Sequence, residues 1–211
     1  VERIASSGQP VVHLDMADTY QLGAEFYRWE FAIAVAGHIL GIHPFDQPNV
    51  QGAKDRTERV LQKYLSAGRL PQVEAPGSLK ALLSQAGPGR YLAIMAYLHQ
   101  APEMDEALAE LRRTVMERHH VATTVGYGPR FLHSTGQLHK GGPDSGCFLQ
   151  VTDDHPGDPP VPGEPYTFGV LAAAQALGDL QVLQALGRPV ARVHLGGAGV
   201  AGIRKLTKEV G

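Results

Sequence analysis

Two polar side chains in the first part of the chain have types and a spacing that could do chemistry together. Gln47 and Lys54 lie seven residues apart, just after a hydrophobic segment and a turn that contains Pro44. An amide side chain both donates and accepts hydrogen bonds, as binding of a polyhydroxy ligand requires. A lysine ammonium is a mobile cation that stabilises an oxyanion when a sugar ring opens or an enediol forms. The alternative is that Lys54 is a solvated surface residue and that Asp46 only caps a helix.

A second candidate segment is the glycine-rich run GYGPRFLHSTGQLHKGGPDSG, residues 126–146, which contains His139. It follows a predicted strand, and ligands bind at the loops that follow strands in open α/β sheets. A histidine in such a loop acts as an acid or a base near neutral pH. The alternative for His139 is a loop residue that only orders the glycine-rich backbone.

The elements that must position these residues alternate between apolar runs and amphipathic patterns. We predict strands over 11–14, 91–98, 121–125, 148–152 and 190–194. We predict helices from Asp18 to Gly41 and over 49–66, 79–85, 103–119, 166–177, 179–186 and 200–210. Gly178 is expected to interrupt the helical pattern between 166 and 186. This alternation is typical of an α/β fold, a three-layer αβα sandwich with a mostly parallel sheet. We expect a single domain over 1–211, with loop-rich excursions at 68–89 and 153–165.

Composition excludes several classes of protein. The formal net charge is -2 and no cluster of Lys and Arg stands out, so we expect no nucleic-acid partner. No apolar run approaches the roughly 20 residues that span a bilayer, so we expect no membrane partner. A single cysteine, Cys147, forms no internal disulfide, which favours a reducing, cytoplasmic location. No HExxH or Cys/His spacing occurs, and we expect neither a metal nor a cofactor.

The segment FYRWEFAIAVAGHILGIHPFDQPNVQGAK, residues 26–54, resembles the second signature of the phosphoglucose isomerase family. The matching positions are Gly37, Ile39, Leu40, Phe45, Asp46, Gln47, Val50 and Lys54. Three residues depart from the usual pattern, in which an asparagine stands at His43, a glycine at Asn49 and a glutamate at Gln51. The resemblance implies that Lys54 is catalytic and that Gln47 binds substrate.

A wider resemblance covers nearly the whole chain. The runs 126–146 and PGEPYTFGVLAAAQALGDLQ, residues 162–181, are similar to the isomerase half of bifunctional transaldolase/phosphoglucose isomerase proteins. It implies a sugar-isomerase (SIS)-like fold, a homodimer, and upstream isomerase and transaldolase domains in a longer protein of cytoplasmic carbohydrate metabolism. Aligning HSTGQLHKGG with the family's HxxxQLIHQG makes His139 the ring-opening residue. That alignment needs a one-residue gap, and the order of the two motifs is reversed relative to the ordinary enzymes.

The resemblance implies the interconversion of glucose 6-phosphate and fructose 6-phosphate through an enediol, with a carboxylate base in a motif like SMESNG. Neither that motif nor a Ser/Thr-rich phosphate loop occurs in the sequence. We therefore expect a C-terminal part of such an enzyme, with an incomplete active site. Two alternatives stay open: a non-catalytic module that binds sugar phosphate, and a structural domain that completes an oligomer interface.

Overall fold

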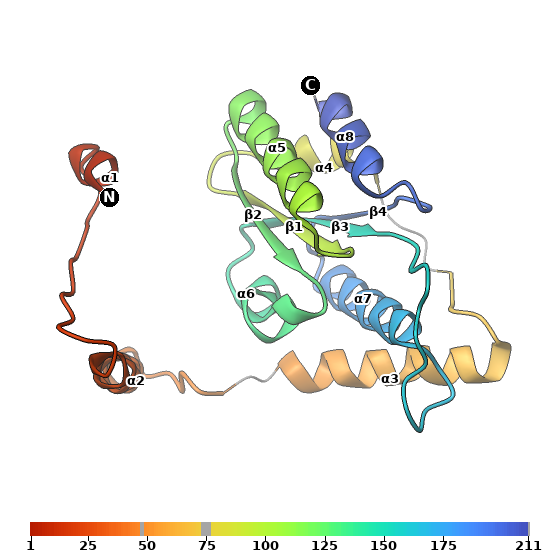
Figure 1. The fold of residues 1–211 in the computed structure, drawn as a ribbon, viewed down its shortest axis with the longest axis horizontal. Helices are drawn as coiled ribbons and strands as arrows, with labels where there is room; N and C mark the ends of the chain where they lie inside the picture. Colours follow the sequence, from red (N-terminus) through yellow and green to blue (C-terminus); the bar gives the residue numbers. More distant parts are fainter. Residues whose placement is uncertain (47–48, 73–76, 211) are drawn as a thin grey trace. The chain divides into compact units, whose positions relative to one another are not determined.

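The computed structural model describes residues 1–46, 49–72 and 77–210, with the side chains of residues 49 and 50 left aside. The chain divides into two compact units, Val1–Asp46 and Gln47–Gly211, and each is described by itself (Figure 1). The sequence predicted a single domain over 1–211 and did not distinguish these two units. The division arises because the hydrophobic core clusters draw only on residues 60–210.

The first unit consists of α1 (Glu2–Ser6), an extended segment and α2 (Gln21–Leu40). Asp18, predicted to cap α2, lies three residues before Gln21, and the residue at the N-cap position is Tyr20. Asp18 Oδ1 nevertheless accepts a hydrogen bond from the Gln21 backbone N–H at 3.1 Å. Gly41 ends α2 with φ 67°, a left-handed angle that glycine adopts without steric cost. The predicted strand over 11–14 is wrong. That segment has no hydrogen-bonded neighbour in a sheet, and an isolated extended segment is not a strand.

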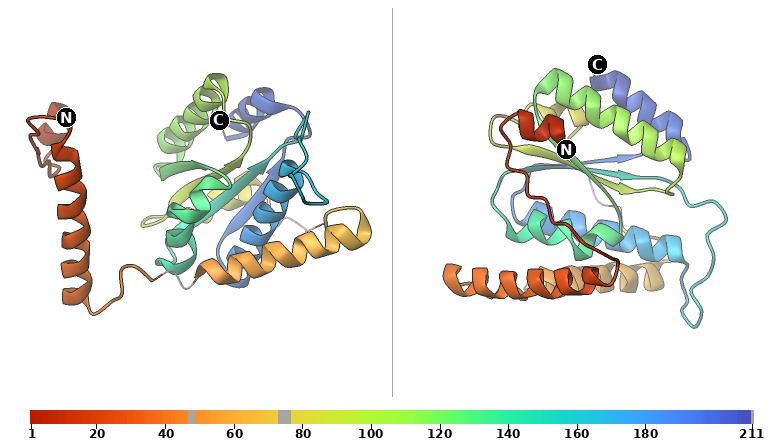
Figure 2. Two further views of the ribbon diagram at one scale, coloured as in Figure 1. Left: turned by 60° about the horizontal axis from the view of Figure 1, so that its bottom comes forward. Right: turned by 60° about the vertical axis from the view of Figure 1, so that its left-hand side comes forward.

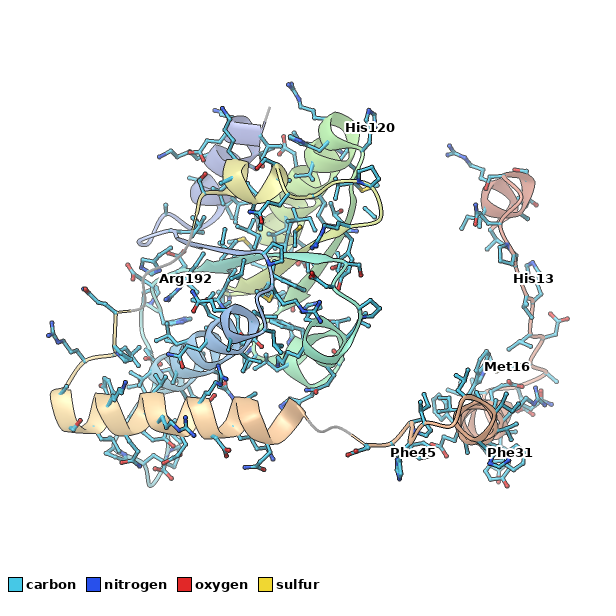
Figure 3. All side chains as sticks on the ribbon, turned by 180° about the vertical axis from the view of Figure 1, so that it is seen from behind. His13, Met16, Phe31, Phe45, His120 and Arg192 are labelled. Atoms are coloured by element: carbon cyan, nitrogen blue, oxygen red, sulfur yellow. The ribbon has the colours of Figure 1, made fainter. Side chains whose placement is uncertain are left out.

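Most large apolar side chains of α2 are exposed within this unit. Trp29, for example, is 58% exposed, and Figure 3 shows Phe31 and Phe45 directed away from the backbone of the first unit. Gly37 is the residue of α2 that is buried, because Pro44 packs directly against it. A Cβ on residue 37 would lie 2.5 Å from Cδ of Pro44. Among the residues that the structure describes, no helix is both long and apolar enough to cross a membrane.

The second unit is built on a sheet of four parallel strands in the order β2-β1-β3-β4. The strands are β1 (Tyr91–Tyr97), β2 (Ala122–Tyr127), β3 (Gly146–Thr152) and β4 (Val190–His194). The two central strands, β1 and β3, are buried almost throughout, which explains their nearly continuous apolar sequences. Four of the five predicted strands are therefore present, with bounds that shift by at most two residues.

Helices cover both faces of the sheet (Figure 2). On one face lie α4 (Leu79–Leu83), α5 (Pro102–His119) and α8 (Gly199–Val210), whose apolar side chains share a core with alternate strand residues. On the other face lie η1 (Arg130–His133), α6 (Thr135–Gly141) and α7 (Phe168–Ala185), and α3 (Asn49–Ala67) packs on the outside of α7. The predicted α/β fold, a three-layer sandwich, is confirmed.

Two local predictions are corrected in this unit. The run 126–146, expected to be a loop, folds into η1 and α6 before β3 begins. Gly178 does not interrupt a helix but lies inside the continuous α7. A Cβ on Gly178 would meet Thr57 Oγ1 at 2.8 Å and the Thr57 backbone nitrogen at 3.1 Å. Glycine therefore serves the close approach of α3 to α7 and not a break in α7.

The two predicted excursions differ in content. Residues 68–89 include α4, which Ser78 caps by accepting a hydrogen bond from the Ala81 backbone N–H. Residues 153–165 contain no helix or strand, and a single antiparallel bridge between Pro160 and Thr167 closes the loop.

An ion pair is buried between α6 and α7. Lys140 Nζ lies 2.8 Å from Asp179 Oδ1, and the two side chains are 0% and 1% exposed. Burial raises the pKa of the Asp179 carboxyl, and the charge of Lys140 opposes that rise. Gln150 of β3 donates a hydrogen bond to the Ala176 carbonyl at 2.9 Å in the same layer. These polar contacts give α6 and α7 defined positions on an otherwise apolar face of the sheet.

His139 is packed in the core beside this pair. Its side chain is 5% exposed, and its ring lies against Phe131 and Phe148, with centroid distances of 5.8 and 4.9 Å. Burial, and then the neighbouring charge of Lys140, lower the pKa of His139 to about 4. The imidazole is therefore neutral at physiological pH, and its Nδ1 makes no hydrogen bond with the described residues.

Replacing Asp179 by Ala should cost about 3–5 kcal/mol of unfolding free energy, because it leaves the Lys140 charge buried without a partner. The double variant Lys140→Met/Asp179→Leu should recover most of that loss. Asp144→Asn is the control, since this carboxylate is 57% exposed beside Arg90 and Arg188, and its replacement should cost far less than that of Asp179. Urea unfolding measures all three, and equal costs for Asp179→Ala and Asp144→Asn would contradict the burial of the pair.

The stability of the wild type should fall in acid relative to His139→Phe. The folded pKa of about 4 is below the ordinary 6.5, so the unfolded chain binds the proton first as the pH drops. The difference in unfolding free energy between the two proteins should be constant above pH 6.5 and change by roughly 3 kcal/mol between pH 6.5 and pH 4. A parallel pH profile for the two proteins would show that His139 is not buried in its neutral form.

Candidate functional site

Lys54 lies at the rim of an open cavity of about 300 Å³ in the second unit. Residues from α3, η1, α6 and α7 and from the loop before α7 surround it. The lining residues are Ala53, Lys54, Thr57, Glu58, Leu61, Leu132, His133, Gln137, Lys140, Tyr166, Leu171 and Gln175. We call this cavity the Lys54 pocket.

Helix periodicity explains the α3 side of the pocket. Lys54, Glu58 and Leu61 are separated by four and three residues, so they lie along one side of α3. Leu61 is buried against Leu177 of α7, which anchors that side of the helix. The close contact between Thr57 and Gly178 sets how near α3 lies to α7. Lys54 lies one turn before Thr57 and two turns before Leu61, so these anchors hold it at the opening.

The α6 side of the pocket supplies amide and ammonium groups. Gln137 Nε2 donates a hydrogen bond to the Leu132 carbonyl at 2.8 Å, which fixes the amide against η1. Lys140 forms part of the floor, but its charge is neutralised by Asp179. Glu58 accepts a hydrogen bond from Gln62 at 2.7 Å and makes no ion pair with Lys54. Within the described part of the chain, Lys54 is thus a cation without an ion-pair partner at the mouth of the pocket.

The structure brings together some of the residues singled out in the sequence and not others. Lys54 lines the pocket, as does Lys140 from the glycine-rich run. His139 lies next to Lys140 in sequence, but its ring faces the core between two phenylalanines and does not line the pocket. Gln47 lies outside the described residues. Lys54 is therefore the residue of the segment 37–54 that lines the same cavity as Gln137 and Lys140 of the glycine-rich run.

Several lining residues were not singled out from the sequence, notably Gln137, Tyr166 and Gln175. Gln175 carried a signal, because it is a polar residue in the apolar run LAAAQAL and such residues need a reason. Gln137 lies in the glycine-rich run that was expected to be a loop, where periodicity is uninformative, and Tyr166 is the first residue of the predicted helix over 166–177. No group of three or more His, Cys, Asp or Glu side chains within the described ranges is arranged to hold a metal ion.

Comparison with known proteins finds local similarity to glucose-6-phosphate isomerases. Those of Lactiplantibacillus plantarum and Shouchella clausii are each 40% identical to this chain over 53 residues, and that of Exiguobacterium sibiricum is 42% identical over 52 residues. Each alignment covers 25% of this chain and only 12% of the relative. No protein-family model matches the chain.

Among solved structures, the chain resembles a hypothetical protein from Thermus thermophilus. The TM-score is 0.50 at 15% sequence identity, and the match covers 75% of this chain and 42% of that one. At this identity the match supports the α/β fold alone. Over a quarter of its length, however, the chain is similar to glucose-6-phosphate isomerases.

Proposed function

We propose that the Lys54 pocket binds a sugar phosphate and that this chain supplies part of the active site of a glucose-6-phosphate isomerase. The observation that carries the proposal is the position of Lys54. Its ammonium makes no ion pair with the described residues and stands at an open pocket whose other polar groups are mainly amides, hydroxyls and an imidazole. The chain that presents it is locally similar to enzymes of that name.

The chemistry proposed for Lys54 is electrostatic. Interconversion of an aldose and a ketose phosphate moves a proton between neighbouring carbons through an enediol, and an oxygen of that intermediate carries negative charge. A cation held in a partly enclosed site stabilises this charge more in the transition state than in the ground state. Gln137, Gln175 and Tyr166 offer donors and acceptors for sugar hydroxyls, and we assign Gln47 the same role.

The proton-transferring base of this proposal comes from elsewhere. The sequence contains no motif like SMESNG, and the pocket carboxylate Glu58 is hydrogen-bonded to Gln62. We therefore propose that an upstream isomerase domain of a longer protein supplies the base, in a cytoplasmic homodimer that also carries a transaldolase domain. The similarity of residues 126–146 and 162–181 to bifunctional proteins of that kind supports this part of the proposal.

A ring-opening role for His139 stays a prediction. For that role the imidazole must reach substrate and exchange protons near neutral pH. In the present conformation the ring is enclosed and its pKa is about 4, which favours a packing role that orders α6.

A second candidate function is a module that binds sugar phosphate without catalysis. The missing carboxylate motif favours it, since binding requires only the cation and the hydrogen-bonding groups. The two candidates differ in kcat and not in affinity.

Lys54→Met should weaken binding of glucose 6-phosphate to this chain by about tenfold or more, because it removes one charge-assisted contact. Lys54→Arg, which keeps the charge, should lose less. Lys63→Met on the same helix is the matched control, since Lys63 is exposed and does not line the Lys54 pocket. Isothermal titration calorimetry compares the variants with the wild type, and equal affinities for Lys54→Met and Lys63→Met would contradict the proposed site.

The purified chain should bind glucose 6-phosphate but not convert it, because the base is absent from its sequence. A coupled assay for fructose 6-phosphate measures this directly. Turnover by the chain alone would overturn the assignment of the base to another domain. In the longer enzyme, Lys54→Met should lower kcat by about a hundredfold if the lysine serves the transition state. An unchanged kcat with weaker binding would favour the binding module.

A further inference from the structure

The C-terminal edge of the sheet has the topology of a ligand-binding crevice. From β1 the chain passes to α5 on one face of the sheet, and from β3 it passes to α7 on the opposite face (Figures 1 and 2). Because β1 and β3 are neighbours, their following segments diverge and leave a gap between them. Ligands of open α/β sheets bind in the crevice at such a switch point.

Two adjoining cavities of about 320 and 550 Å³ occupy this position. They share Tyr97 at the end of β1, the loop residues Asp154, His155 and Asp158 after β3, and Gly169 at the start of α7. The first cavity also reaches Arg192 and His194 on β4. Their lining residues do not overlap with those of the Lys54 pocket. We call the two cavities together the switch-point crevice.

Two of the carboxylates in the crevice are already used within the protein. Asp153 accepts hydrogen bonds from the backbone N–H groups of Gly197 and Gly199, at 2.6 and 3.0 Å, at the start of α8. Asp158 accepts one from the Gly169 N–H at 2.6 Å, at the start of α7. Both helix N-termini therefore already hold an anion, and a ligand must be recognised by other groups.

The groups that remain available include a row of hydrogen-bonding side chains. His194 Nε2 lies 3.2 Å from Asp154 Oδ1, and His194 Nδ1 lies 3.0 Å from Thr152 Oγ1. The side chains of His194 and Asp154 are 51% and 61% exposed and so are open to a ligand, whereas Thr152 is buried and orients the His194 ring. A carboxylate and an imidazole side by side can accept from and donate to neighbouring hydroxyl groups.

Arg192 contributes a guanidinium to the crevice, and among the described residues it has no ion-pair partner. It pairs with Gln150 in the register of β3 and β4, and Figure 3 labels it on the edge strand. Its Nε is shielded from solvent without an acceptor, and no other described group forms an ion pair or hydrogen bond with its guanidinium. Burial lowers the pKa of Arg192, but a guanidinium stays charged in proteins. A partly buried charge without a partner favours binding of an anion, which offsets the desolvation cost.

We propose that the switch-point crevice is a second ligand site, separate from the Lys54 pocket, for a small hydroxylated organic anion. The anionic group pairs with Arg192, and the hydroxyl groups bind to Asp154 and to His194, whose ring Thr152 orients. A phosphate ester and a carboxylate satisfy the same guanidinium, so the shared chemistry is an oxyanion joined to a polyol. The proposal does not depend on the function assigned to the Lys54 pocket.

The test uses the full chain labelled with nitrogen-15 and titrated with glucose 6-phosphate, gluconate and glucose. At least one of the two anions should shift the backbone amide signals of residues 152–158 and 192–194, and the one with the larger effect identifies the preferred oxyanion. Uncharged glucose should cause no saturable shift there. Arg192→Gln should weaken the effect at these residues by about tenfold or more, while Arg192→Lys, which keeps the charge, should lose less.

Controls separate this site from the Lys54 pocket and from misfolding. Arg204→Gln on the exposed side of α8 makes the same chemical change and should leave the titration unchanged. Lys54→Met should abolish shifts around α3 and α6 but not those at residues 152–158. The dispersion of amide signals shows whether each variant is folded. Absence of saturable shifts at the crevice with both anions, or equal responses of Arg192→Gln and Arg204→Gln, would overturn the proposal.

Discussion

The buried ion pair between Lys140 and Asp179 is the interaction on which the arrangement of the Lys54 pocket depends. It joins α6 to α7 at a distance of 2.8 Å inside a layer that is otherwise apolar. Apolar packing alone tolerates several registers of two helices, whereas a buried charge is tolerated only where its partner lies. α6 forms one wall of the pocket, and α3, which packs on α7, forms the opposite wall. The ion pair between α6 and α7 therefore fixes the position of one wall relative to the other.

The second constraint is the close approach of α3 to α7. Gly178 provides the space that Thr57 occupies, and Arg56 donates a hydrogen bond to the Gln181 carbonyl nearby. These contacts orient α3 so that Lys54 faces the opening and Leu61 faces the core. The cation is thus positioned by the packing of neighbouring turns of α3 and not by a direct partner of its own. This leaves its ammonium available for a ligand.

Much of the fold could be predicted from the sequence, because burial leaves a strong pattern. The runs of β1 and β3 are apolar on both faces, and α5 shows a clear apolar stripe, so their bounds differed from the prediction by at most two residues. The strand over 11–14 failed because alternation within one segment does not reveal whether a pairing partner exists. The predictions of a helix break at Gly178 and of a loop where α6 lies were wrong because glycine has two roles. It can break a helix or let another backbone come close, and the sequence alone does not distinguish these roles.

The candidate site was less accessible to prediction than the fold. Lys54 was recognisable within a spaced signature, but many of the side chains around it come from η1, α6 and α7, far along the chain from α3. The environment of His139 was also not predictable. Its sequence neighbours are polar and glycine-rich, but its ring lies between Phe131 and Phe148. Both His139 and Lys140 are buried, and which of them faces the sheet and which faces the pocket depends on the phase of a short helix, whereas glycine-rich sequences carry little periodicity.

The carboxylate of Asp153 has a consequence for how this fold is related to nucleotide-binding sheets. The turn Gly196–Gly197–Ala198–Gly199 joins a parallel strand to a helix, and its N–H groups converge as those of a phosphate-binding loop do. Here a side chain from the neighbouring strand end occupies that place as a built-in anion. An Asp153→Ser variant removes this built-in anion. The Asp154 carboxylate, whose Oδ2 lies 3.5 Å from where a Cβ of Gly197 would stand, must also be replaced before an oxyanion can bind there.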